Sequence, residues 1–150
     1  ADGRARGFLM GATAGRTTLM GEGLQHQDGH SLVLASTVPP VQAYDPAFAY
    51  EVAAIVQAGL ERMYGDTGEE PDVFYYLTLY NENYVMPARP DNPALTHEIM
   101  RGLYRFAPAP AAGKQATLLF SGSAFGAAQA AAAALLDRYD IGVELWSATS

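Results

Sequence analysis

Apolar side chains recur at three- and four-residue steps between residues 46 and 64, which places them on one face of a helix. Asp45 and Pro46 precede this pattern and suit an N-cap followed by the first helical position, where a missing N–H costs nothing. Gly65 supplies a stop signal. The pattern predicts a helix over residues 46–64 whose buried face consists of Phe48, Val52, Ile55, Val56, Leu60 and Met63.

Residues 73–80 are almost all apolar or aromatic and do not alternate with polar residues. Such a run of β-forming residues predicts a strand that is covered on both faces. A second, shorter helical pattern begins at Asn92 and Pro93 and continues to about Tyr104. The segment between these elements, residues 81–91, contains two prolines, so we expect it to be extended.

The composition changes at residues 107–113, which contain only alanine, proline and glycine and therefore predict a linker. The pattern beyond the linker predicts a strand over 116–121, a helix capped by Ser123 that runs to Tyr139, and a strand over 143–147. This order is typical of a βαβ unit with parallel strands. Because two strands cannot cover their own faces, we expect this unit to continue or to pack on something else. The predicted helix face consists of Phe125, Ala128, Ala132, Leu135, Leu136 and Tyr139.

The composition narrows the class of protein. The chain has 150 residues, of which 49% are hydrophobic and 17% charged, enough apolar mass for one core domain. A formal net charge of -7 argues against a nucleic-acid partner, and no apolar run is long enough for a membrane span. The absence of cysteine excludes disulfides, thiolate zinc sites and cysteine nucleophiles, so a cytoplasmic location is allowed. The chain starts at Ala1 rather than Met and has no signal peptide, so we expect a start that is cut rather than processed.

Residues 11–31 differ from the rest of the chain, because they combine five glycines, two histidines and two carboxylates with almost no apolar periodicity. Long polar loops in compact domains tend to be functional. The part from Gly11 to Thr17 partly matches a phosphate-binding loop, but one residue between the glycines is missing and Arg16 replaces the required lysine. We therefore interpret that part as a turn.

The remainder of this segment allows three interpretations. Glu22, His26, Asp28 and His30 could form a zinc or iron site, although Gly23 and Gly29 oppose the helix that a zincin motif needs. Alternatively, His26 is an acid, a base or a hydrogen-bond donor in a cleft, with Glu22 setting its charge and tautomer. In the third interpretation both histidines only satisfy backbone carbonyls of the loop. The residues alone leave these alternatives open.

Four segments in this order closely resemble the homodimeric bacterial pyruvate dehydrogenase decarboxylase component: residues 11–31, 44–51, 59–64 and 81–87. The resemblance extends from about Gly7 to the end of the chain. It implies an α/β fold, with residues 1–104 as the later part of a transketolase-like, pyrimidine-binding middle domain. Residues 105–113 would be the linker, and residues 114–150 the first, truncated βαβ unit of the C-terminal domain.

The resemblance also implies an activity, which is oxidative decarboxylation of pyruvate on thiamine diphosphate and Mg²⁺. The acetyl group passes to the lipoyl group of the dihydrolipoyl acetyltransferase, in a homodimeric cytoplasmic enzyme. His26 falls on an active-centre histidine of the family and Glu22 on its active-centre glutamate, while Gln25, Asp28 and His30 would line the active centre. The family's diphosphate and metal motif and the glutamate that activates the aminopyrimidine belong to stretches before Ala1. We therefore expect this chain to be inactive by itself.

Two hypotheses compete with this one. The chain could be a small acidic α/β module that binds a partner through an exposed edge, which would require a complete domain. It could also be a metal hydrolase that uses Glu22, His26, Asp28 and His30, which would require tightly bound metal.

Overall fold

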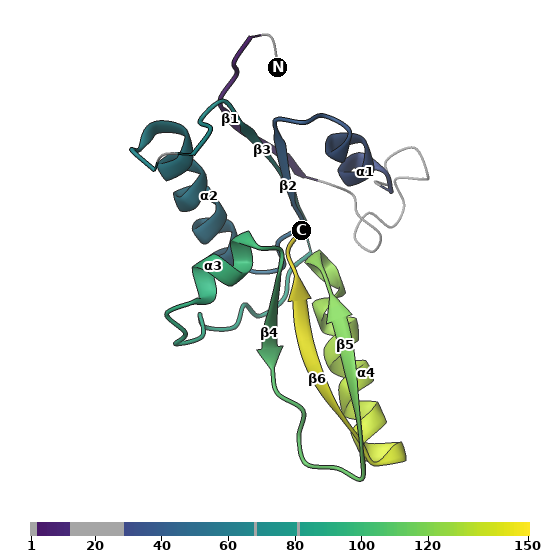
Figure 1. Ribbon diagram of the computed structural model, residues 1–150. Coiled ribbons are helices and arrows are strands. Elements are labelled where there is room, and N and C mark those ends of the chain that lie inside the picture. The colour runs from purple at the N-terminus through teal and green to yellow at the C-terminus, as the bar shows by residue number, and fades with distance from the viewer. Residues whose placement is uncertain (1–2, 13–28, 68, 81) are drawn as a thin grey trace.

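The computed structural model describes residues 3–12, 29–67, 69–80 and 82–150. Two three-stranded sheets lie one above the other in Figure 1, and helix α3 (Leu95–Met100) lies near their junction. The first sheet is fully parallel and has the order β1-β3-β2. Its strands are β1 (Gly7–Ala12), β2 (Val41–Tyr44) and β3 (Phe74–Leu79).

The predicted strand at residues 73–80 is confirmed as β3, the central strand of this sheet. Its buried face carries Tyr75 and Leu77, which pack under α2 (Ala49–Tyr64). Phe74 and Tyr76 point to the other face, toward α1 (Ser31–Ser36), and are half-buried. The two helices thus lie on opposite faces (Figure 1), and among the described residues only the α2 face is fully covered.

The predicted helix over residues 46–64 is confirmed as α2, with two corrections. The helix begins at Ala49 and its N-cap is Phe48, so Asp45 is not the cap. Leu60 is 47% exposed rather than buried, whereas Gly59 faces the sheet. The periodicity identified the buried face of the helix, but it assigned Leu60 to that face in place of Gly59.

The predicted βαβ unit is confirmed as β5 (Lys114–Phe120), α4 (Phe125–Tyr139) and β6 (Ile141–Ala148), with β5 and β6 parallel. Strand β4 (Leu103–Ala107) was not predicted, and it pairs with β6 in antiparallel orientation. The expected helix end at Tyr104 is therefore wrong. Helix α3 ends at Met100, and Gly102, with φ of +90°, turns the chain into β4. The assignment of the two sheets to two domains stays a prediction.

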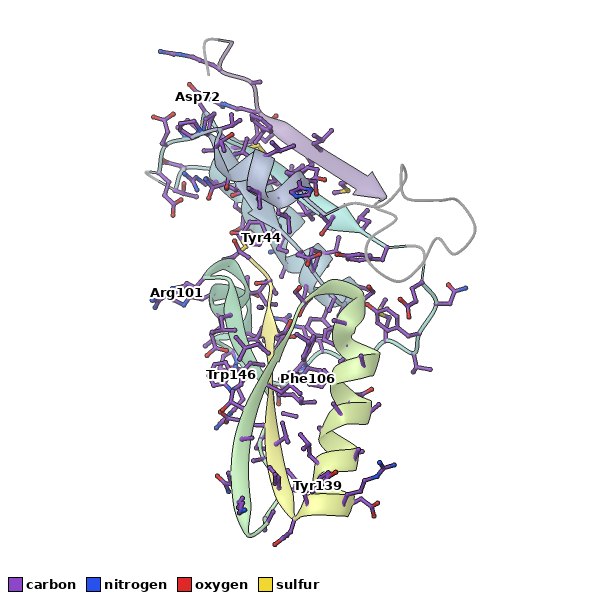
Figure 2. The ribbon with its side chains drawn as sticks, turned by 90° about the vertical axis from the view of Figure 1, so that its right-hand side faces the viewer. Tyr44, Asp72, Arg101, Phe106, Tyr139 and Trp146 are labelled. Atoms are coloured by element: carbon purple, nitrogen blue, oxygen red, sulfur yellow. The ribbon has the colours of Figure 1, made fainter. Side chains whose placement is uncertain are left out.

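Helix α4 covers one face of the second sheet, and Trp146 lies on the opposite face (Figure 2). A short 3₁₀ turn, η2 (Gly122–Ala124), precedes it, so Ser123 is not its N-cap. Phe125 and Ala128 are buried as predicted, whereas Leu136 and Tyr139 are exposed. The C-terminal end of α4, which carries Leu136 and Tyr139, therefore extends beyond the buried part of the second sheet.

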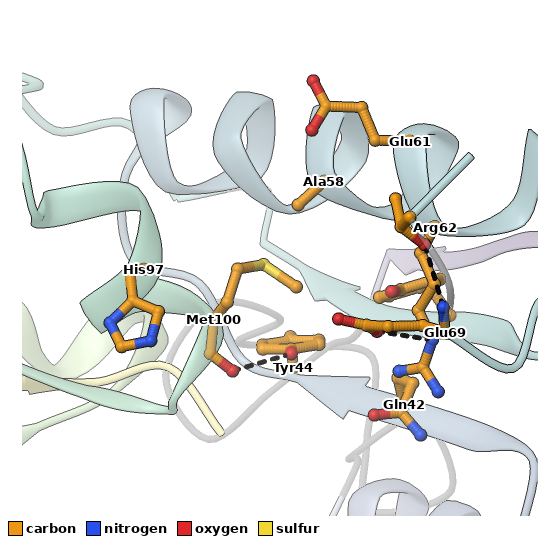
Figure 3. A pocket seen from close by; sticks show the side chains of 10 residues that line it. Gln42, Tyr44, Ala58, Glu61, Arg62, Glu69, His97 and Met100 are labelled. Carbon is orange, nitrogen blue, oxygen red and sulfur yellow. Dashed lines mark hydrogen bonds and ion pairs between the residues drawn. The ribbon is translucent and has the colours of Figure 1, made fainter. Parts of the chain in front are cut away.

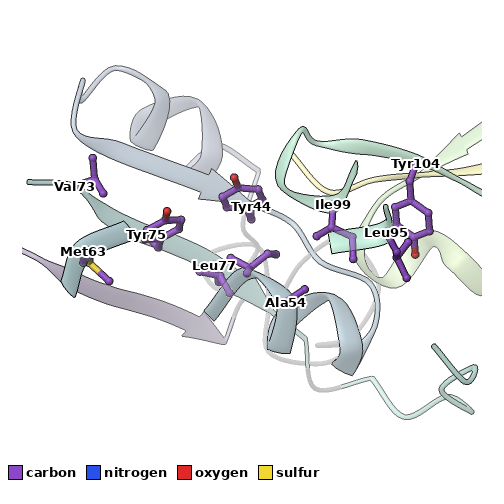
Figure 4. Packing of buried hydrophobic residues seen from close by; sticks show 10 residues of the cluster. Tyr44, Ala54, Met63, Val73, Tyr75, Leu77, Leu95, Ile99 and Tyr104 are labelled. Atoms are coloured by element: carbon purple, nitrogen blue, oxygen red, sulfur yellow. The ribbon is translucent and has the colours of Figure 1, made fainter. Parts of the chain in front are cut away.

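Two apolar cores meet at the start of α2. The first lies between α2, α3 and the first sheet (Figure 4). The second lies between α4 and the second sheet, but it also contains Ala47 and Phe48 from the turn before α2. The Phe48 ring lies 4.7 Å from that of Phe125 and 5.2 Å from that of Phe106, measured between centroids. One aromatic side chain of the first unit therefore fills the core of the second.

At Gly59, helix α2 packs closely on the first sheet. A Cβ atom at this position would lie 2.8 Å from Phe8 Cζ and 2.9 Å from Tyr75 Cε2. Overpacking costs about 1–3 kcal/mol, and the better helix propensity of alanine returns up to about 1 kcal/mol. We predict that Gly59→Ala lowers the free energy of unfolding by about 1–2 kcal/mol in urea titrations of the purified protein.

Gly126 in α4 provides the matched control, because no atom lies within 4 Å of a Cβ built there. Gly126→Ala should leave stability unchanged or raise it by up to about 1 kcal/mol. Equal stabilisation by both substitutions would contradict the close packing of α2 on β1 and β3.

Candidate functional site

The strands of the first sheet end at one common edge, because all three are parallel. Ligands of open parallel sheets bind beyond the carboxyl ends of the strands. Ala12 at the end of β1 is paired with Leu79 at the end of β3, so the chain leaves both strands side by side. The polar segment that the sequence singles out follows Ala12 directly, which makes this edge the candidate site.

Four of the five predicted site residues, Glu22, Gln25, His26 and Asp28, lie outside the described residues. His30 is described, and it is exposed at the position directly before α1. Within the described ranges no three His, Asp or Glu side chains come together as metal ligands would. The structure therefore leaves the roles predicted for this segment untested.

A buried carboxylate, that of Asp45, organises the carboxyl edge. Asp45 follows β2 and is 3% exposed. Its Oδ1 atom accepts hydrogen bonds from the Thr78 hydroxyl and the Tyr80 hydroxyl, each at 2.5 Å. Because Thr78 belongs to β3 and Tyr80 follows it, the contacts fix the ends of two neighbouring strands relative to each other.

The main chain of Asp45 joins this edge to the second sheet. Its N–H donates to the carbonyl of Thr149 at 2.8 Å, and its carbonyl accepts from the N–H of Gly122 at 3.3 Å. Gly122 has φ of +49°, and a Cβ atom there would lie 2.4 Å from Tyr80 Cε2. Only glycine combines this backbone conformation with so close an approach to the Tyr80 ring.

Glu51 forms a second buried carboxylate cluster one turn into α2, and it is 0% exposed. One oxygen accepts from the backbone N–H groups of Ala47 and Phe48, at 2.5 and 3.1 Å. The other accepts from the hydroxyls of Tyr104 in β4 and Ser147 in β6, both at 2.7 Å. Four donors from three elements thus satisfy one buried charge.

Tyrosine hydroxyls complete this cluster as donors. Burial, followed by the nearby Glu51 carboxylate, raises the pKa of Tyr104, so its proton stays available for Glu51. Tyr50 then donates to the Tyr104 oxygen at 2.5 Å, and burial raises the pKa of Tyr50 as well. Burial also raises the pKa of Tyr84 to about 12, and its hydroxyl donates to the carbonyl of Ala47. As donors, these protonated hydroxyls fix the position of Glu51 and of the turn before α2.

Sequence reasoning missed both carboxylates as structural centres. Asp45 was predicted to cap a helix, and Glu51 was noticed only as the last residue of the segment 44–51. The available signal was the capping-box position of Glu51, three residues after Phe48, which accepts the N–H of that N-cap residue. Its contacts with β4 and β6 carry no local signal because they span 53 and 96 positions.

The chain is similar to proteins of one enzyme family. The model of the family described as "Pyruvate dehydrogenase E1 component middle domain" matches residues 1–87. A pyruvate dehydrogenase E1 component from Mycolicibacterium smegmatis is 54% identical over 151 residues, and one from Mycobacterium tuberculosis is 53% identical; each match covers 100% of this chain. One from Escherichia coli K12 is 48% identical over 149 residues and covers 99%. The chain spans 16% of the length of each of these relatives.

Solved structures support the fold. A transketolase mutant from Pichia stipitis aligns with 83% of this chain at a TM-score of 0.58 and 18% sequence identity. The alignment covers 16% of the transketolase chain. Another Pichia stipitis transketolase, in complex with sedoheptulose-7-phosphate, aligns at a TM-score of 0.57. At this identity the likeness concerns the fold, and it confirms the transketolase-like α/β class that the sequence predicted.

The hydrogen bonds of Glu51 should contribute strongly to the stability of the protein. Glu51→Ala leaves the buried N–H and hydroxyl donors without an acceptor, and each such group costs about 1–3 kcal/mol. We expect the free energy of unfolding to fall by at least about 3 kcal/mol in urea titrations. Glu51→Gln should cost less, because its amide oxygen still accepts from the backbone and hydroxyls can turn to accept from its NH₂ group.

Glu61 is the matched control on the same helix, since it is exposed and its side chain accepts from Gln57, which is exposed as well. Glu61→Ala should change stability by no more than about 0.5 kcal/mol. A loss for Glu51→Ala as small as that for Glu61→Ala would show that the buried cluster does not hold the two sheets together.

Proposed function

Because the chain belongs to the pyruvate dehydrogenase E1 component family, we propose that it is the part of such an enzyme that carries active-centre residues of the middle domain. The reaction of the whole enzyme would be oxidative decarboxylation of pyruvate with acetyl transfer to a lipoyl group. The observation that carries this proposal is the agreement between the family match and the parallel sheet. The segment with Glu22 and His26 follows the strand end where such sheets bind ligands.

His26 is the proposed catalytic residue. An imidazole titrates near neutral pH, so it can hold or move a proton beside a substrate carbonyl or hydroxyl. Glu22 would orient this imidazole and favour its charged form, because a nearby carboxylate stabilises imidazolium. Gln25, Asp28 and His30 would line the same site. These roles come from the resemblance of residues 11–31 to the family.

Thiamine diphosphate, the cofactor that the family implies, would supply the electron sink for decarboxylation. The described part of this chain does not fit the diphosphate and Mg²⁺ end of the cofactor. Asp45 and Glu51 already accept hydrogen bonds from protein donors, and no cluster of metal ligands occurs among the described residues. The metal and diphosphate would therefore be held by other parts of the enzyme.

The proposed partners follow from the same family. They are pyruvate, the lipoyl domain of the dihydrolipoyl acetyltransferase and a second subunit of a homodimer, in the cytoplasm. Among the described residues no helix is long and apolar enough to cross a membrane. Since the chain spans 16% of its relatives' length, we expect catalysis only from the complete enzyme and none from residues 1–150 alone.

The test uses the full-length enzyme that contains this chain. We predict that His26→Ala lowers kcat for pyruvate by about 10²- to 10⁴-fold, the contribution typical of a general acid or base. Glu22→Gln should lower it less, because it removes only the orienting charge. Decarboxylation is followed with an artificial electron acceptor, and acetyl transfer by acetylation of a lipoyl domain.

Gln57→Ala serves as the control, because Gln57 is exposed on α2 and its side chain donates to Glu61, which is exposed as well. Its kcat should equal that of the wild type. All three variants should keep the wild-type melting temperature, so that a lost rate reports on the site. Wild-type rates in His26→Ala would remove His26 from the active centre.

A further inference from the structure

A cavity of about 360 Å³ lies beside the outer strand β2, between α2 and α3 (Figure 3). Its size falls in the range of small-molecule sites, which combine apolar walls with a few convergent polar groups. The family assignment does not involve it. Its lining residues come from β2, β3, α2, the loop after α2, and α3: Gln42, Tyr44, Ala58, Glu61, Arg62, Thr67, Glu69, Tyr75, His97 and Met100.

Arg62 supplies the charge at one end of the cavity. Its Nε atom lies 3.2 Å from a Glu69 carboxylate oxygen and donates to the carbonyl of Glu70 at 3.1 Å. Both contacts use Nε, and they fix the plane of the guanidinium. The Tyr75 hydroxyl is hydrogen-bonded to Arg62, and Figure 3 shows the Gln42 amide next to the guanidinium. A guanidinium fork beside an amide is a typical arrangement for binding a carboxylate.

Tyr44, Tyr75, Ala58 and Met100 supply the apolar part of the cavity, and Glu61, Thr67 and His97 also line it. Tyr44 is 5% exposed, and its hydroxyl donates to the carbonyl of Met100 at 3.0 Å. Its ring is stacked with that of Tyr75 at 6.1 Å between centroids and an interplanar angle of 16°. Met100 lies beside Tyr44, and Ala58 faces them from α2 (Figure 3). A flat apolar body can therefore lie against Tyr44 and Met100 without moving a side chain.

Glu69 is paired with Arg62, and its carboxylate competes with that of a ligand; Glu61 is the other carboxylate that lines the cavity. Its side chain is 61% exposed, whereas that of Arg62 is 25% exposed. An exposed ion pair contributes little to stability, so Glu69 can exchange for the carboxylate of a ligand. The Glu70 carbonyl contact would keep Arg62 in place during this exchange.

We propose that this cavity is a binding site for a small monocarboxylate with a flat apolar body. The carboxylate binds the terminal nitrogens of Arg62 and the amide of Gln42, and the apolar body packs on Tyr44 and Met100. Inorganic phosphate is a poorer match, because one guanidinium does not balance its charge and it leaves the apolar wall uncovered. An ammonium ligand lacks the carboxylate that the Arg62 guanidinium would bind.

Benzoate is the probe, and isothermal titration of the full-length enzyme is the measurement. We expect benzoate to bind with a Kd on the order of 1 mM, and benzylamine and inorganic phosphate to bind at least about tenfold more weakly. Arg62→Met should weaken benzoate binding at least about tenfold, and Arg62→Lys should weaken it too, because lysine lacks the planar fork. Glu69→Gln should tighten binding roughly threefold, since it removes the competing carboxylate.

Arg89→Met is the matched control, because the Arg89 side chain is exposed and donates to Thr96. It should leave benzoate binding unchanged. Saturating pyruvate should not displace benzoate, so the result is independent of the proposed catalytic site. Benzoate binding that survives Arg62→Met, or that pyruvate abolishes, would overturn the proposal. If the Arg62 variants do not fold, unchanged affinity in Glu69→Gln and in Gln42→Ala would overturn it equally.

Discussion

The buried carboxylate of Glu51 is the constraint on which the arrangement of the two sheets depends. A carboxylate without donors is too costly to bury, so the chain must bring enough donors to it. The turn before α2 supplies two N–H groups, and β4 and β6 supply one hydroxyl each. These donors reach the Glu51 carboxylate together only when the start of α2 packs against the second sheet. The side chain of one residue in α2 therefore fixes how the two sheets are placed relative to each other.

Aromatic packing and hydrogen bonds have different roles where the start of α2 meets the second sheet. Phe48 contributes apolar area to the second core, but ring contacts tolerate small rotations and shifts. The hydrogen bonds of Glu51 and Asp45 are directional, and they determine which rotation and shift is adopted. The φ of Gly122 lets the second unit approach Tyr80 at the carboxyl edge. Residues of both sheets therefore determine the geometry of the carboxyl edge of the first sheet, the proposed catalytic edge.

The start of α2, next to the proposed catalytic edge, and the Arg62 guanidinium of the cavity lie toward opposite ends of that helix. Phe48 and Arg62 are separated by about 20 Å along the helix, from a rise of about 1.5 Å per residue. The edge is built on buried carboxylates that are satisfied by the protein, whereas the cavity presents a guanidinium beside an apolar wall. The two sites therefore differ in chemistry.

The sequence by itself determined the elements whose periodicity is strong, namely α2, β3 and the β5–α4–β6 unit, and the motifs that identify the family. It misjudged the stretch around Tyr104, because a short apolar run fits a helix or a strand equally well until a pairing partner is known. Pairing with β6 made that stretch β4. The roles of Asp45 and Glu51 were likewise decided by tertiary structure. A carboxylate next to a helix start has the same local pattern whether it caps the helix or binds hydroxyls some 30 to 100 positions away, and only folding brings those hydroxyls near.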